Sequence, residues 1–568
     1  MNHPSPAIVA QSSVRRLPRR ALLLLCVTYV LAGFIGRDPL KNADVTAFGT
    51  MLELVAGTSS WWSPTLMGQA EPGLLLPHWL GAWAIALAPS WVDPAFAARI
   101  PFMALLAAAL MATWYCVYYL ARAPRAQPVA FAFGGEARPA DYARALADGG
   151  LLGLLACLGL AQLSHETTPA LVQLGCAALA FFGLAALPYR AGPALTALAL
   201  GLLGLALSGA PTVATLLGLG GAATCLIERG DDDSAAARRR QALWVLLLTG
   251  ATAALATALD LWYWRVTLPA AQWSTWRSLG RLLLWFTWPI WPLALWTLWR
   301  WRKQLLGGRP ERHFAIPLWF LAVLVAGTLL APPSDRALLL GLPALAALAA
   351  FALPTFGRSM AALIDWFTLL FFTACAITIW VIWISLQTGV PAKPAANVFK
   401  LAPGFEPVFS APAFVLALAA TAIWVWLVRW RVGRHRAAIW KSMVLPAGGT
   451  VLCWFLLMTL GMPTLNYARS YAPLVHLVQA QMQAQMHGPA GCVEIFGFTR
   501  AQIAAFRFHG GMDLREASAT PSGCPWLLVS HSDSLPALRD TIGGQPWTLV
   551  ASVRRPADKD EDMLLFRR

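Results

Sequence analysis

Residues 361–386 read AALIDWFTLLFFTACAITIWVIWISL, an apolar run with a single charge. A helix of this length crosses the hydrocarbon core of a bilayer, which is roughly 30 Å thick. Twelve further runs of this kind lie along the chain, at 21–35, 101–121, 149–164, 168–187, 193–208, 211–227, 243–263, 281–299, 314–331, 337–354, 411–430 and 443–461. The sequence therefore predicts an all-α polytopic membrane protein with about 13 transmembrane helices.

The composition supports this fold class. Of the 568 residues, 58% are hydrophobic and 12% are charged, whereas about 25% of the residues of a soluble domain are charged. A soluble globular enzyme is excluded. The net charge of +16 does not indicate nucleic-acid binding, because Lys and Arg form short clusters between the apolar runs, as in cytoplasmic loops.

Four of these clusters are strongly basic, at 122–144, 229–240, 300–312 and 429–441. Even numbers of apolar runs separate them, so all four are expected on the cytoplasmic side together with the basic amino terminus. The large first loop, about 36–100, and the carboxyl terminus are then external. The ambiguous run at 74–88 is expected to lie along the outer face as an interfacial segment. In a bacterium this corresponds to the inner membrane, with a periplasmic carboxyl terminus.

The apolar runs stop near residue 462. Strand-like stretches at 492–496 and 526–529 then alternate with helical ones such as 499–506, which predicts a transmembrane domain at 1–461 and a small α/β domain at 462–568. Cys492 and Cys524 are the two cysteines of this polar region, and we expect them to form a disulfide in an oxidising compartment. The other seven cysteines lie in apolar runs, and none is spaced to form a zinc site.

The first external loop collects residues that could carry chemistry. Carboxylates at a membrane face can accept the proton of an acceptor hydroxyl or amine, and cations can hold an anionic leaving group. Asp44 is the first residue of an amphipathic stretch at 44–56, which predicts a surface helix. A negative charge at the N-terminus of a helix is favourable, so Asp44 could also act as a helix cap. Spacing alone leaves capping and catalysis equally open for this residue. The charged and titratable residues of the loop are Arg37, Asp38, Lys41, Asp44, Glu53, Glu71, His78 and Arg99.

This loop resembles the opening of the GT-C glycosyltransferases of the aminoarabinose (lipid A) transferase and protein O-mannosyltransferase type. The matching residues are GRDPLKNAD at 36–44, Glu53, Trp61-Trp62, Glu71-Pro72, His78-Trp79 and Arg99-Ile100-Pro101, with Trp288-Pro289, Ser334-Asp335-Arg336 and Leu342-Pro343 further on. The resemblance implies inverting transfer of a sugar from a polyprenyl-phosphate donor to a lipid or glycan acceptor, of the lipid A or lipopolysaccharide kind, on the periplasmic face.

The resemblance also implies roles for individual residues. Asp44 corresponds to the catalytic base, with Asp38 as the second candidate. Aligned without a gap, the acidic pair of the family falls on Ala43 and Asp44, and the Arg that follows the pair and the Lys of the later E-K-P-P-L motif are absent. No metal site is implied, and the need for a divalent metal stays open. The candidate substrate-binding residues are Arg37, Lys41, Glu71, His78, Arg99, Glu166 and Arg336.

Three other functions are alternatives to sugar transfer. A secondary transporter should carry charges in mid-span, and these spans are nearly free of charge. A glycan polymerase or ligase usually has a large, late external loop rich in Arg and His, whereas the loop at 387–410 carries only Lys393 and Lys400 as basic residues. A non-catalytic GT-C paralogue would explain the missing family charges. We expect an active cavity walled by 36–100, His165-Glu166, 332–336 and 387–410.

Overall fold

The computed structural model describes residues 5–71, 73–228, 235–263, 272–307, 311–330, 335–432, 438–485, 491–519, 523–542, 547–558 and 561–568. Within these ranges, seven helices are long and apolar enough to span a membrane. The number rises to eight if one bent pair of helices counts as a single span. The seven are α4 (Pro94–Ala121), α7 (Pro169–Ala186), α10 (Ala235–Ala258), α14 (Arg312–Leu329), α17 (Arg358–Thr388), α19 (Ala411–Val432) and the segment Ile439–Leu460, which ends in α20 (Val444–Leu460). The bent pair is α11 (Trp273–Phe286) and α12 (Ile290–Arg300).

Shorter helices complete the bundle. Each of the 13 predicted apolar runs contains a helix or a pair of helices, so the chain is a multi-pass membrane protein. The run at 281–299 is not one straight helix, because α11 and α12 meet at 87° around Pro289, which has no N–H to continue the ladder. The shorter elements are α1 (Arg19–Ala32), α5 (Pro139–Ala156), α6 (Leu158–Leu163), α8 (Ala191–Leu207), α9 (Pro211–Ile227), α13 (Arg302–Leu306), α15 (Asp335–Leu339), α16 (Leu342–Ala350) and α18 (Ala392–Leu401), with 3-10 turns η1 (Gln11–Ser13), η2 (Pro124–Ala126), η4 (Leu353–Thr355) and η5 (Ile439–Met443).

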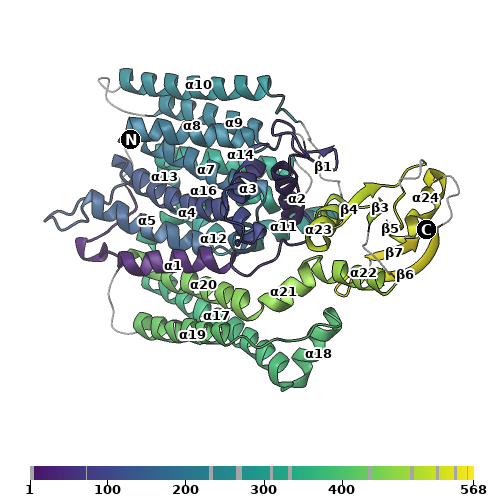
Figure 1. Ribbon diagram of the computed structural model, residues 1–568. Coiled ribbons are helices and arrows are strands. Elements are labelled where there is room, and N and C mark those ends of the chain that lie inside the picture. Colours follow the sequence, from purple (N-terminus) through teal and green to yellow (C-terminus); the bar gives the residue numbers. More distant parts are fainter. Residues whose placement is uncertain are drawn as a thin grey trace.

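Small residues let the helices of the bundle approach closely. At Gly201 of α8, an added Cβ would lie 2.6 Å from the backbone of α7 at Cys176 and Ala180. Such contacts replace the hydrophobic driving force that lipid does not provide. Figure 1 shows α7, α8, α9 and α10 stacked on one side of the bundle, and α17 and α19 beside α20 on the other.

The first loop folds into α2 (Ala43–Val55), a hairpin of β1 (Thr65–Leu66) and β2 (Gln69–Ala70), and α3 (Leu76–Leu87). The amphipathic helix predicted at 44–56 is therefore present as α2. Helix α3 packs on α2 and α4, and its 12 residues extend only about 18 Å. It is too short to cross the bilayer alone, as expected for the run at 74–88.

The C-terminal domain is a five-stranded sheet in the order β4-β3-β5-β7-β6, in which β3 is parallel to β4 and β5 and β7 is antiparallel to β5 and β6. Cys492 and Cys524 form the predicted disulfide, with Cα atoms 5.0 Å apart. Two linking helices, α21 (Met462–Arg469) and α22 (Ala472–Ala484), lead into the sheet. The remaining elements are β3 (Cys492–Phe496), α23 (Arg500–Gly510), β4 (Asp513–Glu516), β5 (Trp526–Ser530), η6 (Ser532–Ser534), α24 (Leu535–Ile542), β6 (Thr548–Arg554) and β7 (Asp562–Arg567).

The C-terminal domain packs directly on the first loop through α23 and α2, which lie side by side (Figure 1). Gly49 of α2 allows this approach, because a Cβ there would lie 2.4 Å from the Cβ of Ala504. The rings of Phe48 and Phe508 meet edge to face with centroids 4.8 Å apart, and Arg507 forms an ion pair with Glu53. The first and last parts of the chain thus build one surface.

Candidate active site

Asp44 is the centre of a buried polar cluster at the start of α2. Its Oδ1 accepts hydrogen bonds from the backbone N–H of Thr167 at 2.7 Å and from the Thr167 hydroxyl at 2.6 Å. Its Oδ2 accepts from the backbone N–H of Leu40 at 3.0 Å and lies 3.5 Å from Nη2 of Arg37. No side chain caps α2, whose N-cap is Asn42. Asp44 therefore joins the first loop to Thr167 and does not cap the helix.

The environment of Asp44 favours the carboxylate. Burial disfavours its ionised form, but the charges of Arg37 and Arg99 and the hydrogen bonds from Thr167 and Leu40 outweigh burial, so the pKa of Asp44 lies below its ordinary value. Arg99 reaches this region from α4, where it donates to the backbone carbonyl of Phe34 at 3.4 Å. Asp44 is thus ionised at neutral pH.

Glu166 is a second buried carboxylate in the same cluster. Its Oε2 lies 2.7 Å from Nη2 of Arg336, and its Oε1 lies 4.0 Å from Nη2 of Arg37. Burial and the charge of Asp44 raise the pKa of Glu166, although Arg336 and Arg37 oppose the shift. Two neighbouring carboxylates therefore have pKa values displaced in opposite directions, which is a common signature of acid–base sites.

Arg37 connects the two carboxylates and has donor capacity left. It donates from Nη1 to the backbone carbonyl of His165 at 3.1 Å. Among the described residues, its buried Nε and Nη2 have no hydrogen-bond partner, which is costly unless a further group binds there. A cavity of about 100 Å³ lies beside Arg37, with apolar walls from α20 and α21 and with Arg469 at its edge. An anion with a hydrocarbon tail would suit this cavity.

The other predicted residues lie elsewhere. Nζ of Lys41 is paired with Asp558 at 2.7 Å and with Glu561 at 2.8 Å. The side chain of this lysine therefore fastens the first loop to the C-terminal domain. Asp38 lines a different cavity, of about 390 Å³, which the 387–410 segment enters through Phe405 and Glu406.

Glu71 and His78 form a second cluster. Glu71 lies 2.8 Å from Nη1 of Arg500, in the C-terminal domain, and 3.9 Å from Nε2 of His78. Burial lowers the pKa of His78, so its ring is neutral at neutral pH and does not act as a cation. Of the loop at 332–336, residues 332–334 lie outside the described residues, and Arg336 joins the Asp44 cluster.

Sequence reasoning missed three residues of these sites, Thr167, Arg469 and Arg500. Thr167 directly follows the His165-Glu166 pair that is predicted to wall the cavity, so its position next to this pair could have identified it. Arg469 lies 432 positions from Arg37 and Arg500 lies 429 positions from Glu71, so no local pattern connects them. Within the described part of the chain, no group of three His, Cys, Asp or Glu residues is placed to hold a metal ion.

Solved structures with this fold include the crystal structure of ArnT from Cupriavidus metallidurans bound to undecaprenyl phosphate. It matches with a TM-score of 0.58 at 14% identity, over 97% of this chain and 98% of that chain. The apo structure of the same ArnT matches with a TM-score of 0.58 at 15% identity, over 96% and 98%. No family model matches the chain, and no curated protein matches it. The fold expected from the resemblance is confirmed over almost the whole chain.

Proposed function

We propose that this protein is an integral-membrane glycosyltransferase that moves a sugar from a polyprenyl-phosphate-linked donor to a lipid or glycan acceptor of the lipid A or lipopolysaccharide kind. The reaction takes place on the periplasmic face of a bacterial inner membrane, where residues 462–568 form a periplasmic domain on the transmembrane domain 1–461. The observation that carries the proposal is the buried cluster of Asp44, Arg37 and Glu166 beside an apolar cavity.

The donor phosphate is assigned to Arg37 and Arg469. Among the described residues, the buried Nε of Arg37 has no hydrogen-bond acceptor, and its Nη2 has only the long ion-pair contacts with Asp44 and Glu166. Both arginines border the cavity. Leu457, Met458 and Leu465 line the same cavity and suit the first isoprene units of a polyprenyl chain. The fold shared with an ArnT structure that contains undecaprenyl phosphate supports this choice of donor. Arg37 and Arg469 are preferred to Lys41 as phosphate ligands, because two carboxylates already pair with Lys41.

The proposed reaction is a single displacement. The acceptor oxygen attacks the anomeric carbon, and the bond from that carbon to the donor phosphate oxygen breaks. The phosphate leaves with the bonding electron pair, and Arg37 compensates its charge. The proton of the acceptor hydroxyl passes to Asp44, the proposed base, which is ionised at neutral pH. Glu166 faces the same Arg37 guanidinium as Asp44, and its raised pKa suits a second carboxyl group that takes part in proton transfer.

The test uses cells in which the gene is deleted and variants are supplied on a plasmid. Mass spectrometry of lipid A and other glycans identifies the product that depends on the wild-type protein. We expect Asp44→Asn to abolish this product and Glu166→Gln to reduce it. Asp38→Asn is the matched control and should retain it. Thermal unfolding of each purified variant separates lost chemistry from lost folding.

Two results would oppose the proposal. Full activity of a folded Asp44→Asn variant together with loss of activity in Asp38→Asn would move the base to the second candidate. Identical glycan profiles in the deletion strain and the wild type would remove the evidence for transfer and favour a non-catalytic role.

A further inference from the structure

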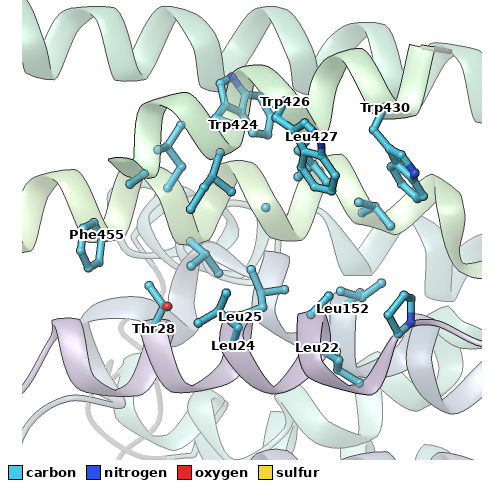
Figure 2. A pocket seen from close by; sticks show the side chains of 18 of the residues that line it. Leu22, Leu24, Leu25, Thr28, Leu152, Trp424, Trp426, Leu427, Trp430 and Phe455 are labelled. Atoms are coloured by element: carbon cyan, nitrogen blue, oxygen red, sulfur yellow. The ribbon is translucent and has the colours of Figure 1, made fainter. Parts of the chain in front are cut away.

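An apolar groove runs between α1 and α19, at some distance from the candidate active site. Both helices pack on α20, and a cavity of about 310 Å³ lies between them. Figure 2 shows Leu24 and Leu25 of α1 on one side and Trp424 and Leu427 of α19 on the other, with Phe455 of α20 at the end near Thr28. Because the walls are almost entirely aliphatic and aromatic, the groove is suited to a hydrocarbon chain.

The length of the groove matches one leaflet of a bilayer. On the α1 side its lining extends from Leu17, two residues before the helix, to Thr28. The helical part, residues 19–28, rises about 14 Å at 1.5 Å per residue. The hydrocarbon core is roughly 30 Å thick, so the groove covers about half of it. Only 11% of the apolar window of α19 is buried, so this helix faces lipid over most of its length. A chain from a single leaflet would fill the groove.

One end of the groove is rich in positive charge. On the α1 side, Arg16 and Arg20 are exposed next to the lining residues Leu17 and Ala21, and Arg429 is exposed beside Trp430 on the α19 side. Arg431, the other arginine beside Trp430, is already paired with Asp365. The exposed arginines therefore present a mouth that is complementary to a phosphate.

Aromatic contacts join the two sides of this mouth. Nζ of Lys441 lies 5.4 Å from the ring centroid of Trp430. The Trp430 ring stacks on Trp440 at 6.5 Å, and the Trp440 indole donates to the backbone carbonyl of Arg15 at 2.7 Å. The basic ends of α1 and α19 are thereby held close together at the point where the groove opens.

This mouth cannot serve the proposed sugar donor. It lies at the start of α1, whereas Arg37 follows the other end of that helix. A phosphate held at the mouth is therefore separated from Asp44 by the length of α1, about 20 Å. The observations favour a lipid that keeps its head at one membrane surface and its chain in the adjacent leaflet.

We propose that the groove binds an acyl chain of an anionic glycerophospholipid, such as phosphatidylglycerol, whose phosphate is held by Arg16, Arg20 and Arg429. The lipid fills the space between α1 and α19 and stabilises their arrangement on α20. It is a bound structural lipid and takes no part in sugar transfer.

The test measures lipid binding to the purified full-length protein by native mass spectrometry and by thermal unfolding in detergent. The probes are dioleoylphosphatidylglycerol and dioleoylphosphatidylcholine. We expect the first to be retained and to raise the melting temperature, and the second to do so weakly. Arg16→Gln combined with Arg20→Gln should weaken phosphatidylglycerol binding roughly 30-fold, at about fivefold for each lost charge. Arg15 and Arg19 remain in this variant to preserve the orientation of α1.

A matched pair of variants locates the site. Ala420 lines the groove, whereas the neighbouring Ala419 is exposed and does not line it. Ala420→Trp should fill the groove and abolish retention of phosphatidylglycerol, while Ala419→Trp should leave it unchanged. Equal stabilisation by the two lipids, or equal retention by the two tryptophan variants, would overturn the proposal. Displacement of phosphatidylglycerol by added undecaprenyl phosphate in wild type, lost in Ala420→Trp, would also overturn it, because the groove would then belong to the polyprenyl lipid.

Discussion

Replacing Thr167 with valine tests the environment of Asp44 without removing any charge. The change keeps the shape of the side chain and the backbone N–H that donates to Asp44, but removes the hydroxyl that donates at 2.6 Å. A hydrogen bond to a charged group contributes about 1.5–3 kcal/mol. Because this bond favours the carboxylate, its loss should raise the pKa of Asp44 in the folded protein.

The expected loss of stability depends on pH. The pKa of folded Asp44 lies below its ordinary value, so its contribution to stability is complete above the pKa of the unfolded chain and is lost as the pH falls through the folded pKa. At pH 7, Thr167→Val should therefore lose the full 1.5–3 kcal/mol or so of that hydrogen bond. The difference from wild type should shrink in acid, as Asp44 becomes protonated in the variant.

Thermal unfolding can be followed with a thiol-reactive dye, because Cys116 and Cys157 are fully buried and react only on unfolding. Thr168→Val is the matched control, since the buried hydroxyl of Thr168 has no hydrogen-bond partner among the described residues. We expect a melting temperature several degrees lower for Thr167→Val and unchanged or slightly higher for Thr168→Val. Equal melting temperatures for the two variants at pH 7 would refute the assigned role of Thr167.

Three other contacts give separate predictions. Replacing Cys492 and Cys524 by serine should destabilise the C-terminal sheet by about 3–4 kcal/mol on the chain-entropy model for a separation of 32 residues, which limited proteolysis with and without reductant should detect. Lys41→Met should loosen the C-terminal domain from the first loop, because two carboxylates lose their shared cation, and hydrogen exchange in α2 should increase. Arg336→Met removes a charge that lowers the pKa of Glu166, so the acid limb of the activity profile should move to higher pH, while an unchanged profile would exclude Glu166 from proton transfer.

The apolar helices and the strands β3 and β5 could be predicted from the local sequence pattern. Long runs without charge give the helices, and the strands β3 and β5 begin within one residue of their predicted starts, because short apolar stretches near Gly and Pro mark them. The bend between α11 and α12 was overlooked, although Pro289 marked it. The ion pairs of Lys41 with the C-terminal domain could not be predicted from the sequence. Its carboxylate partners lie more than 500 positions away, and only tertiary packing brings them together.

Contacts between the first loop and α23 also have a consequence for biosynthesis. Glu53 and Arg507 are separated by 454 residues, and a ribosome adds about 5–20 residues per second. The first loop is therefore made roughly 20–90 s before its partner helix exists. Throughout that interval Phe48 and Glu53 lack their contacts with Phe508 and Arg507, so this face of α2 is without α23. Either a chaperone at the membrane surface covers this face until synthesis ends, or the face stays exposed for that time.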